Sequence, residues 1–452
     1  MQGTANDPQS ARQMGVWAAT AVVTGEAISL GIFLTPAAMA KSLGSPALLG
    51  TVWCGMALMT LAGALCFTEL AVRNPQDGGE YLYLRRGFGT RVAFLYGWMA
   101  AVVMYPGVAA ALCVGAVPYV QSLIAIPARM VPAIPAFILL VLGAVNYLGT
   151  RLSSGVMTVL NWLKVPMLVG LVGWALASGH ATLANLTPLT ERRPGSDALA
   201  GAIAGAAISA FFTFGGWWEA GKIAGEVRNP SRTLPIAFTG GVLVVTVLYL
   251  LVSLAFVAVV PLEQIQNNTA FVAQFGAALF GSAGGRVLSA CVVLSVLGGL
   301  MVMFMAVPRV TYALARSESG RLAMFARLHP RFGTPANGVL LQTGVALLVL
   351  FLGAFDRILA FIIFPAVVFL ALTAATLFRA ETPVRRWWFP LAPIVFIAGA
   401  GVLALMLLLH GPGPALLGAV VVLAGLAVRW VLVRKPRASS ANDAAVSLTT
   451  DQ

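Results

Sequence analysis

Three charged residues lie inside long apolar stretches of this sequence and are the first candidates for chemistry: Glu26, Lys164 and Glu219. Glu26 belongs to the stretch TGEAISLGIFLTPAAMAKSLG, residues 24–44. A charge in hydrocarbon costs about 3 kcal/mol on insertion scales, so such residues usually face a protein interior or a water-filled cavity. We therefore expect these side chains to mark a functional site rather than a lipid-facing surface.

Two of the apolar segments are interrupted in a similar way. The first reads AISLGIF over residues 27–33, and the second contains Gly215 and Gly216 followed by two tryptophans. A broken helix exposes backbone N–H and C=O groups, which suit the carboxylate and the ammonium group of an amino acid. Glycine can also serve close helix packing. Because paired interruptions are typical of inverted-repeat transporters, we favour a substrate site at the midplane.

Composition identifies the solvent of the fold. The chain has 452 residues, of which 59% are hydrophobic and 10% charged, and its mean hydropathy is +0.90. Soluble domains are about 25% charged, so we expect an all-α integral membrane protein in the lipid bilayer. Twelve apolar segments are long enough to be predicted as transmembrane helices: 15–40, 47–71, 92–124, 131–149, 155–178, 200–221, 235–260, 284–308, 336–354, 358–378, 388–409 and 414–433.

The basic residues are distributed by loop. With twelve spans, 21 of the 28 Lys and Arg residues fall on the side of the two termini, six fall on the other side, and Lys164 lies within a span. This asymmetry predicts cytoplasmic termini and a multi-pass protein of the cell inner (plasma) membrane. The net charge of +13 therefore reflects topology, and we expect no nucleic-acid partner.

Cysteine and histidine patterns give no sign of a metal or a cofactor. All four cysteines fall in apolar segments without metal-ligand spacing, and we interpret them as small buried hydrophobic residues. No nucleotide-binding glycine loop or metal-ligand cluster is present, so enzymatic activity is not expected. The lack of a cysteine outside the spans also argues against a disulfide-linked accessory subunit.

Several long motifs resemble one family. ALCFTELAVRNPQDGGEYLYLRRGFG (64–89), GIFLTP (31–36), NYLGTRLSSGV (146–156) and FFTFGGWWEAGKIAGEVRNPSRTLP (211–235) are similar to the amino acid, polyamine and organocation (APC) superfamily. Within it, the chain resembles amino acid permeases such as the bacterial L-amino-acid-transporter-like members. Related motifs continue through the tenth span.

The resemblance implies a leucine-transporter-like fold that works by alternating access. Residues 1–433 would be the transporter domain, with a 5+5 inverted repeat (15–178 and 200–380), unwound first and sixth spans, and two extra helices at 388–433. The polar tail 434–452 is expected to be a disordered cytoplasmic segment.

Carried over residue by residue, the family's substrate site falls on the two interruptions. The implied substrate-binding residues are Ala27, Ile28, Ser29, Leu30, Gly31, Ile32, Phe212, Thr213, Phe214, Gly215, Gly216 and Trp217. The substrate carboxylate would meet the N–H groups of residues 30–32. Trp218 and Glu219 are candidates for gating.

Lys164 matches a fifth-span lysine that replaces a sodium ion in sodium-independent members. The resemblance implies that Lys164 and Ser295 hold the broken first helix. Burial disfavours a charged lysine, so Lys164 could instead release and regain a proton during the cycle. We hypothesise that Glu26 pairs with Lys164, although it could also face the cytoplasmic cavity or a basic substrate.

The sequence therefore predicts sodium-independent transport of amino acids, most readily neutral ones, as a proton symporter or an amino acid exchanger. A carrier of cationic amino acids or polyamines is the alternative if a carboxylate faces the pocket. A membrane nutrient receptor that binds without transport is the other alternative.

Overall fold

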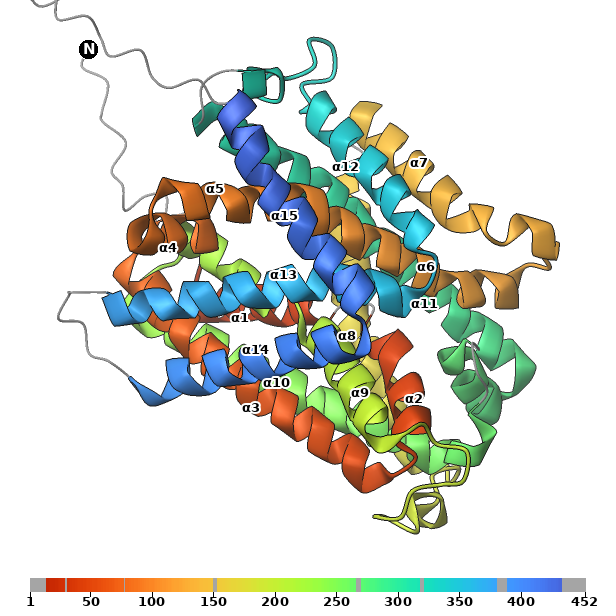
Figure 1. Cartoon of the computed structure of the whole chain (residues 1–452). Helices are drawn as coiled ribbons and strands as arrows, with labels where there is room; N and C mark the ends of the chain where they lie inside the picture. The colour runs from red at the N-terminus through yellow and green to blue at the C-terminus, as the bar shows by residue number, and fades with distance from the viewer. Residues whose placement is uncertain are drawn as a thin grey trace, which may run out of the picture.

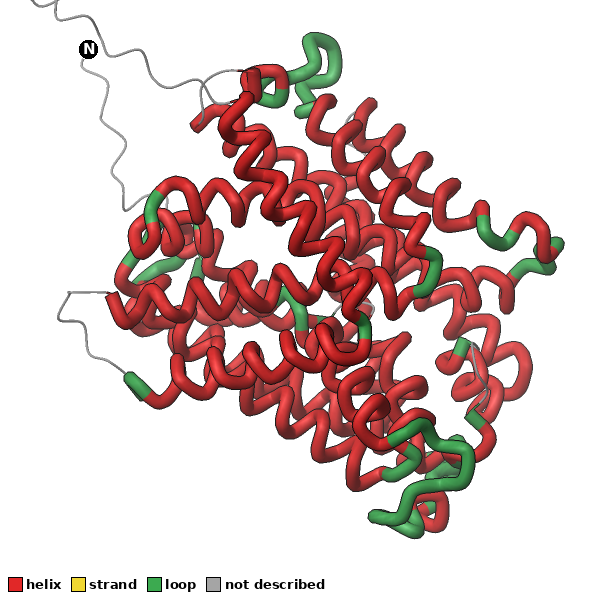
Figure 2. The backbone as a smooth tube through the Cα atoms, viewed as in Figure 1, coloured by secondary structure: helices red, strands yellow, loops and turns green. Residues whose placement is uncertain are grey.

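The computed structural model describes residues 14–28, 31–76, 78–148, 153–265, 270–317, 321–379 and 388–432. Every regular element in these ranges is a helix, and an isolated β-bridge joins Met14 to Val227. Figure 2 shows these helices connected by loops and turns. The all-α architecture predicted from composition is confirmed for this part of the chain, as expected where lipid cannot satisfy backbone polar groups.

Fifteen α-helices form the described part of the bundle. In chain order they are α1 (Val16–Ala27), α2 (Gly31–Leu43), α3 (Pro46–Arg73), α4 (Gly79–Phe88), α5 (Thr90–Met99), α6 (Tyr105–Leu123), α7 (Ala133–Leu148), α8 (Ser153–Ala177), α9 (Leu199–Phe214), α10 (Pro230–Val259), α11 (Phe271–Ser317), α12 (Ala336–Val349), α13 (Phe355–Ala375), α14 (Leu391–His410) and α15 (Pro412–Leu432).

Shorter helical pieces extend or connect them. The π-helical segment η1 (Ala100–Met104) joins α5 to α6, and seven 3₁₀ segments complete the set: η2 (Ala128–Met130), η3 (Leu183–Leu186), η4 (Trp217–Glu226), η5 (Leu262–Gln264), η6 (Arg321–Met324), η7 (Leu350–Leu352) and η8 (Thr376–Arg379).

Each of the twelve predicted apolar segments is largely helical where the structure describes it, and the segment 200–221 is interrupted at Gly215 and Gly216. Eight helices are long and apolar enough to cross a membrane, and the bent pair α1 and α2 would make a ninth. The three remaining segments are shorter apolar helices, at Ala133–Leu148, Val165–Ala177 and Ala336–Leu352. The chain is therefore a multi-pass membrane protein with eight or nine clear spanning candidates among its described residues.

Local sequence signals explain several helix boundaries. Ser45 caps α3 by accepting a hydrogen bond from Leu48 N at 3.4 Å, and Pro46 occupies the first turn, where its missing N–H costs nothing. Gly89 separates α4 from α5 with φ 85°, a backbone conformation that favours glycine. Gly281, with φ 70°, breaks the apparent 47-residue helix α11 into two pieces.

The helices pack as one bundle, in which α10 packs against both α1 and α3, and α9 packs against α2 and α3 (Figure 1). Of the two halves of the first broken segment, α1 contacts η4 and α2 contacts α9. Short α4 lies near the left edge in Figure 1, next to η4 and η8. The bundle thus brings the two broken segments, which are nearly 190 residues apart in sequence, against each other.

One expectation needs correction. Cys66 and Cys113 are buried as predicted, but Cys54 is exposed on α3 and Cys291 is only half-buried, because apolar membrane helices also present residues to lipid. Lys222 lies at the end of the apolar segment Leu199–Lys222 and packs against α4.

Candidate functional site

The two interruptions predicted from sequence lie in contact. α1 ends at Ala27 and α2 begins at Gly31, and the two helices differ in direction by 49°. α9 ends at Phe214, Gly216 adopts φ 101°, and the chain continues as the 3₁₀ segment η4. A Cβ atom on Gly216 would lie 2.7 Å from the carbonyl oxygen of Glu26. Both the backbone angle and this close approach require glycine there.

A second contact joins the outer halves of the broken segments. The hydroxyl groups of Thr35 and Thr213 lie 2.7 Å apart, and a Cβ on Gly31 would meet Thr213 Cα at 2.7 Å. Each hydroxyl also has a carbonyl acceptor in its own helix, Gly31 O for Thr35 at 3.0 Å and Ser209 O for Thr213 at 2.8 Å, so either can be the donor between them. α2 and α9 are therefore packed backbone to backbone beside the breaks.

Tyr249 of α10 stands between the two breaks. Its hydroxyl lies 2.6 Å from Ala27 O and 3.0 Å from Thr213 O, and with one proton it donates to one carbonyl at a time. The rings of Trp53 and Phe214 flank it, with centroids 5.6 and 5.2 Å away. Sequence reasoning missed Tyr249, and its only signal was a phenol inside an otherwise apolar span.

The remaining predicted substrate contacts divide into two groups. Ala27, Ile28, Ile32 and Phe212 are buried beside the breaks, whereas Ser29 and Leu30 lie outside the described residues. The ring of Trp217 packs edge-on against Phe67 and Phe396, so it points toward α3 and α14.

A cluster of charged and polar side chains lies one turn beyond the second break. Lys222 Nζ is 2.6 Å from Glu219 Oε2 and also donates to the Tyr105 hydroxyl. Tyr105 and Trp218 each donate to Glu219 Oε1 at 3.1 Å. Both residues predicted to gate, Trp218 and Glu219, therefore belong to one network with a lysine and a tyrosine that sequence reasoning did not connect to them.

Glu80 of α4 adjoins this cluster and is fully buried. Neither of its carboxylate oxygens has a hydrogen-bond partner of good geometry among the described residues, although the Tyr96 phenol is close enough to favour the ionised form. Glu80 lies outside the spanning helices, and its burial raises its pKa to about 7, an effect opposed by Lys222 and reinforced by Glu219. Glu80 sits within the GGEYLYL sequence, where no pattern distinguished it from a loop charge.

The predicted coupling residues are only partly described. The Glu26 side chain is exposed at the end of α1, and Ser295 is buried with no hydrogen-bond partner for its hydroxyl among the described residues. The side chain of Lys164 lies outside the described part of the structure. The pairing of Glu26 with Lys164 stays a prediction.

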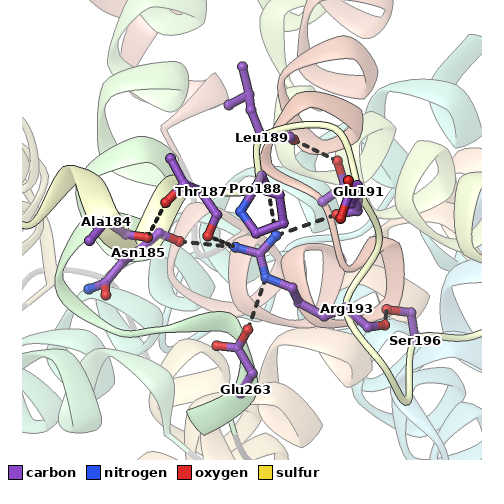
Figure 3. Close-up of polar contacts among 10 residues, drawn as sticks. Ala184, Asn185, Thr187, Pro188, Leu189, Glu191, Arg193, Ser196 and Glu263 are labelled. Carbon is purple, nitrogen blue, oxygen red and sulfur yellow. Dashed lines mark hydrogen bonds and ion pairs between the residues drawn. The ribbon is translucent and has the colours of Figure 1, made fainter.

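The outer end of α2 is tied to the loop that precedes α9. Arg192 Nε donates to Leu43 O at 2.9 Å, and Arg193 N donates to Gly44 O at the same distance. Figure 3 shows the Arg193 guanidinium at the centre of this loop, where it bonds Glu263 Oε1 at 2.9 Å and the carbonyls of Pro188 and Thr187 at 2.6 and 2.9 Å. One arginine thus links the loop to the segment η5.

No group of three or more His, Cys, Asp or Glu residues that could hold a metal ion occurs among the described residues. The site consists of backbone groups at two helix breaks, an aromatic wall and an adjacent cluster with two carboxylates and one ammonium group. Such an arrangement can bind a small zwitterion and hold or release protons.

Comparison with known proteins identifies relatives over most of the chain. It is 27% identical over 401 residues to the serine/threonine exchanger SteT of Bacillus subtilis (strain 168), covering 86% of this chain and 89% of that protein. It is 27% identical over 368 residues to the b(0,+)-type amino acid transporter 1 of Mus musculus, covering 80% and 74%. It is 24% identical over 442 residues to the human (Homo sapiens) cystine/glutamate transporter, covering 95% and 87%.

A solved structure has a similar fold. The structure of MhsT in complex with L-phenylalanine superposes with a TM-score of 0.53 at 15% identity, covering 87% of this chain and 97% of that one. At this identity the likeness shows the fold alone, a leucine-transporter-like arrangement of helices. The family described as amino acid permease matches residues 14–431, nearly the whole chain. This chain therefore belongs to the amino acid permease family, whose relatives here are transporters.

Proposed function

We propose that this protein carries amino acids across the membrane without sodium, by alternating access around the two helix breaks. The observation that carries the proposal is the meeting of these breaks at Tyr249, where the carbonyls of Ala27 and Thr213 lie within hydrogen-bonding distance of one hydroxyl. Backbone groups released from a helix can instead bind a zwitterion. The named relatives, which include a serine/threonine exchanger, support the same substrate class.

The proposed site favours a neutral amino acid. The N–H groups of residues 30–32 would receive the substrate carboxylate, and carbonyls near Ala27, Ile28, Phe212 and Phe214 would receive its ammonium group. The ring of Phe214, packed with Trp53 and Tyr249, offers an apolar wall. A cationic amino acid or a polyamine remains the alternative substrate, because the Glu26 carboxylate is exposed next to the first break.

We propose that Lys164 takes the place of a sodium ion. The Ser295 hydroxyl is buried and lacks a hydrogen-bond partner among the described residues. Because buried hydroxyl groups usually have a partner, this supports a hydrogen-bonding group such as the Lys164 ammonium beside it. Replacing Lys164 with alanine is expected to reduce uptake at least about tenfold, since the carbonyl groups of the broken first helix would lose the ammonium group proposed to hold them. Lys41→Ala, at the outer end of α2, is the matched control and should leave uptake unchanged.

The proposed architecture has twelve spans, which are the nine clear candidates and the three shorter apolar helices. Spans one to five and six to ten would form the inverted repeat within residues 1–433, followed by two extra helices. Both termini would be cytoplasmic in the cell inner membrane. We do not propose a disulfide-linked subunit, because each cysteine lies within an apolar helix.

Uptake by proteoliposomes tests the proposed function. Radiolabelled L-serine, L-threonine, L-leucine, L-arginine and L-glutamate would be offered with and without sodium, with acid outside, and with unlabelled amino acid inside. We expect saturable, sodium-independent uptake of at least one neutral amino acid. Acid-driven accumulation would identify a proton symporter, and uptake only into preloaded vesicles would identify an exchanger. Strict dependence on sodium would contradict the proposal.

The same assay addresses the receptor alternative. A receptor and a carrier would both bind a labelled amino acid, so binding to detergent-solubilised protein cannot distinguish them. Binding without flux into sealed vesicles would show that the protein recognises amino acids but does not transport them.

A further inference from the structure

The cluster of Glu80, Glu219 and Lys222 contains two carboxylates and one ammonium group. Glu219 is well compensated, because Lys222, Tyr105 and Trp218 all donate hydrogen bonds to it. Both oxygens of the Glu219 carboxyl group therefore act as acceptors, and one of them faces an ammonium group. The positive charge of Lys222 is therefore already engaged by Glu219, and the cluster is neutral only if Glu80 carries a proton.

The surroundings of Glu80 suit a protonated carboxyl group. Its side chain has no solvent-exposed surface, and neither oxygen has a hydrogen-bond partner of good geometry among the described residues. The nearby Tyr96 phenol and the local backbone favour the ionised form, but burial outweighs both. A buried carboxylate without such partners is far more costly than a buried neutral acid. The bound proton removes that cost.

The titratable groups near Glu80 come from four elements. Lys222 and Glu219 lie on η4, Tyr96 on α5, Tyr105 on α6, and Tyr83 on α4 itself. Lys222 is the one cation among these groups, and it already forms an ion pair with Glu219.

Among the described residues, η8 and α13 also pack on α4. Arg379 of η8, the segment that packs on α4, is directed to Gly87 O at 3.1 Å and to the ring of Phe88. Where α13 nears α4, its last turn (residues 371–375, sequence ALTAA) contains no ionisable residue.

Glu80 is also placed where the transport cycle can reach it. Gly78 N donates to Lys222 O at 3.3 Å, and a Cβ on Gly79 would lie 2.8 Å from Lys222 Cγ, so the start of α4 fits tightly against η4. The chain just before α1 is joined to the chain just after η4 by the β-bridge between Met14 and Val227. A movement of α1 and η4 away from α4 would expose Glu80 to water.

The cluster combines two partly exposed side chains with one enclosed side chain. The side chains of Lys222 and Glu219 retain 21% and 22% of their surface exposure, whereas Glu80 retains none. The cluster therefore reaches from an accessible surface to an enclosed carboxyl group. Separation of η4 from α4 would extend that access to Glu80.

We propose that Glu80 is a proton-binding site of the transport cycle, which holds a proton while α4 and η4 are in contact and releases it to the cytoplasmic side when they separate. This inference rests on the proposed transport function and makes the protein a proton symporter rather than an obligate exchanger. The proton moves from the Glu80 carboxyl group to water, leaving a carboxylate that is solvated in the open state.

Infrared spectroscopy of the lipid-reconstituted protein tests proton occupancy without any substrate. We expect a protonated-carboxyl band that disappears as the pH rises through about 7 and that is absent from Glu80→Gln. Glu191→Gln, which alters an exposed loop carboxylate, should keep the band. Because the Lys222 ammonium opposes proton binding, Lys222→Met should move the loss of the band to higher pH. A spectrum of Glu80→Gln identical to that of the wild type would overturn the proposal.

Proteoliposomes test the coupling, with radiolabelled L-serine as the probe. The ratio of acid-driven accumulation to L-serine counterflow should fall at least about tenfold in Glu80→Gln, because a glutamine stays neutral throughout the cycle. In Glu191→Gln the ratio should not change. Wild-type counterflow without acid-driven accumulation would overturn the proton site and leave amino acid transport standing. Absence of flux for every amino acid of the panel would instead contradict the proposed function itself.

Discussion

At the scale of single residues, the site depends on polar atoms that are placed in apolar surroundings. The Tyr249 hydroxyl serves two carbonyls from different helix breaks, and Glu219 receives three donors. Each of these groups would be costly if left without a partner. Removing one of them should therefore affect transport more than an equivalent change elsewhere on the surface.

Tyr249→Phe removes only the hydroxyl between Ala27 O and Thr213 O. A hydrogen bond contributes about 1 kcal/mol net, so we expect amino acid uptake to fall about fivefold while the protein still folds. Tyr147→Phe is the matched control, since that phenol packs against His329 away from the breaks. Equal uptake by the two variants would show that the hydroxyl does not organise the site.

Glu80→Gln should change how stability depends on pH. The pKa of Glu80 is raised from the usual 4.5 to about 7 by burial, so the folded protein keeps this proton over a range where the unfolded chain has lost it. The contribution of Glu80 to the free energy of unfolding is thus fully present below pH 4.5 and is lost as the pH rises to about 7. Thermal unfolding in detergent over this range should show a smaller decline for Glu80→Gln than for the wild type. An equal decline would place the titrating group elsewhere.

At the scale of elements, function depends on how helix segments meet rather than on any one long helix. α1 packs on η4 and α2 packs on α9, so each half of the first broken segment has a partner from the second. The outer halves are joined by Thr35 and Thr213 and covered by the loop that Arg193 organises. Changes that disturb these contacts should impair movement or stability without touching a substrate.

Gly216→Ala would place a Cβ atom 2.7 Å from Glu26 O in a backbone with φ 101°. The left-handed conformation alone costs a non-glycine residue about 1–2 kcal/mol, and the close contact adds to it. We expect uptake to fall at least about tenfold, with folded protein still detectable by size-exclusion chromatography. Gly205→Ala in α9 has open space around it and should retain normal uptake. Wild-type activity in Gly216→Ala would exclude a tight contact between the breaks.

Arg193→Ala removes an ion pair to Glu263 and several hydrogen bonds to loop carbonyls. Glu263 is 56% exposed, so we assign most of the effect to the carbonyl contacts and expect a loss of about 2 kcal/mol in the free energy of unfolding. Thermal unfolding of the purified variant measures this. Arg129→Ala, at an exposed position of η2, should leave the unfolding temperature unchanged. A similar shift for both variants would argue that Arg193 adds only surface charge.

At the scale of the whole molecule, hydropathy and charge set the environment in which these contacts act. The described part has eight or nine clear spanning candidates, and three shorter apolar helices complete the proposed twelve spans. The proposed orientation places α4 and η4 at the cytoplasmic side and the loop held by Arg193 at the outer side. Orientation therefore determines which compartment receives the proton from Glu80.

Labelling of single cysteines tests this orientation. In a variant lacking the four native cysteines, a cysteine at Thr190 in the loop before α9 should react with a membrane-impermeant maleimide on intact cells. A cysteine at Gln76, next to α4, should react only after the membrane is opened. The opposite pattern would reverse the proposed topology and with it the direction of proton release.

The sequence by itself determined the features that depend on local patterns. Apolar length predicted where helices form, and the residue types in 27–33 and at Gly215 and Gly216 predicted where the first and sixth segments break. The motif resemblance also predicted the family, which the match over residues 14–431 shows. Such predictions are possible from sequence because transfer to lipid and backbone propensity are properties of short segments.

Only the tertiary structure decided which of these residues meet. Tyr249 lies 222 positions from Ala27, and Lys222 reaches Tyr105 across 117 positions. Glu80 resembled an ordinary loop charge until α4 packed against η4 and removed it from water. Burial and contact depend on how distant helices pack, and a single sequence carries no direct signal of which distant residues will meet. The protonation site proposed here is therefore a property of the packed bundle.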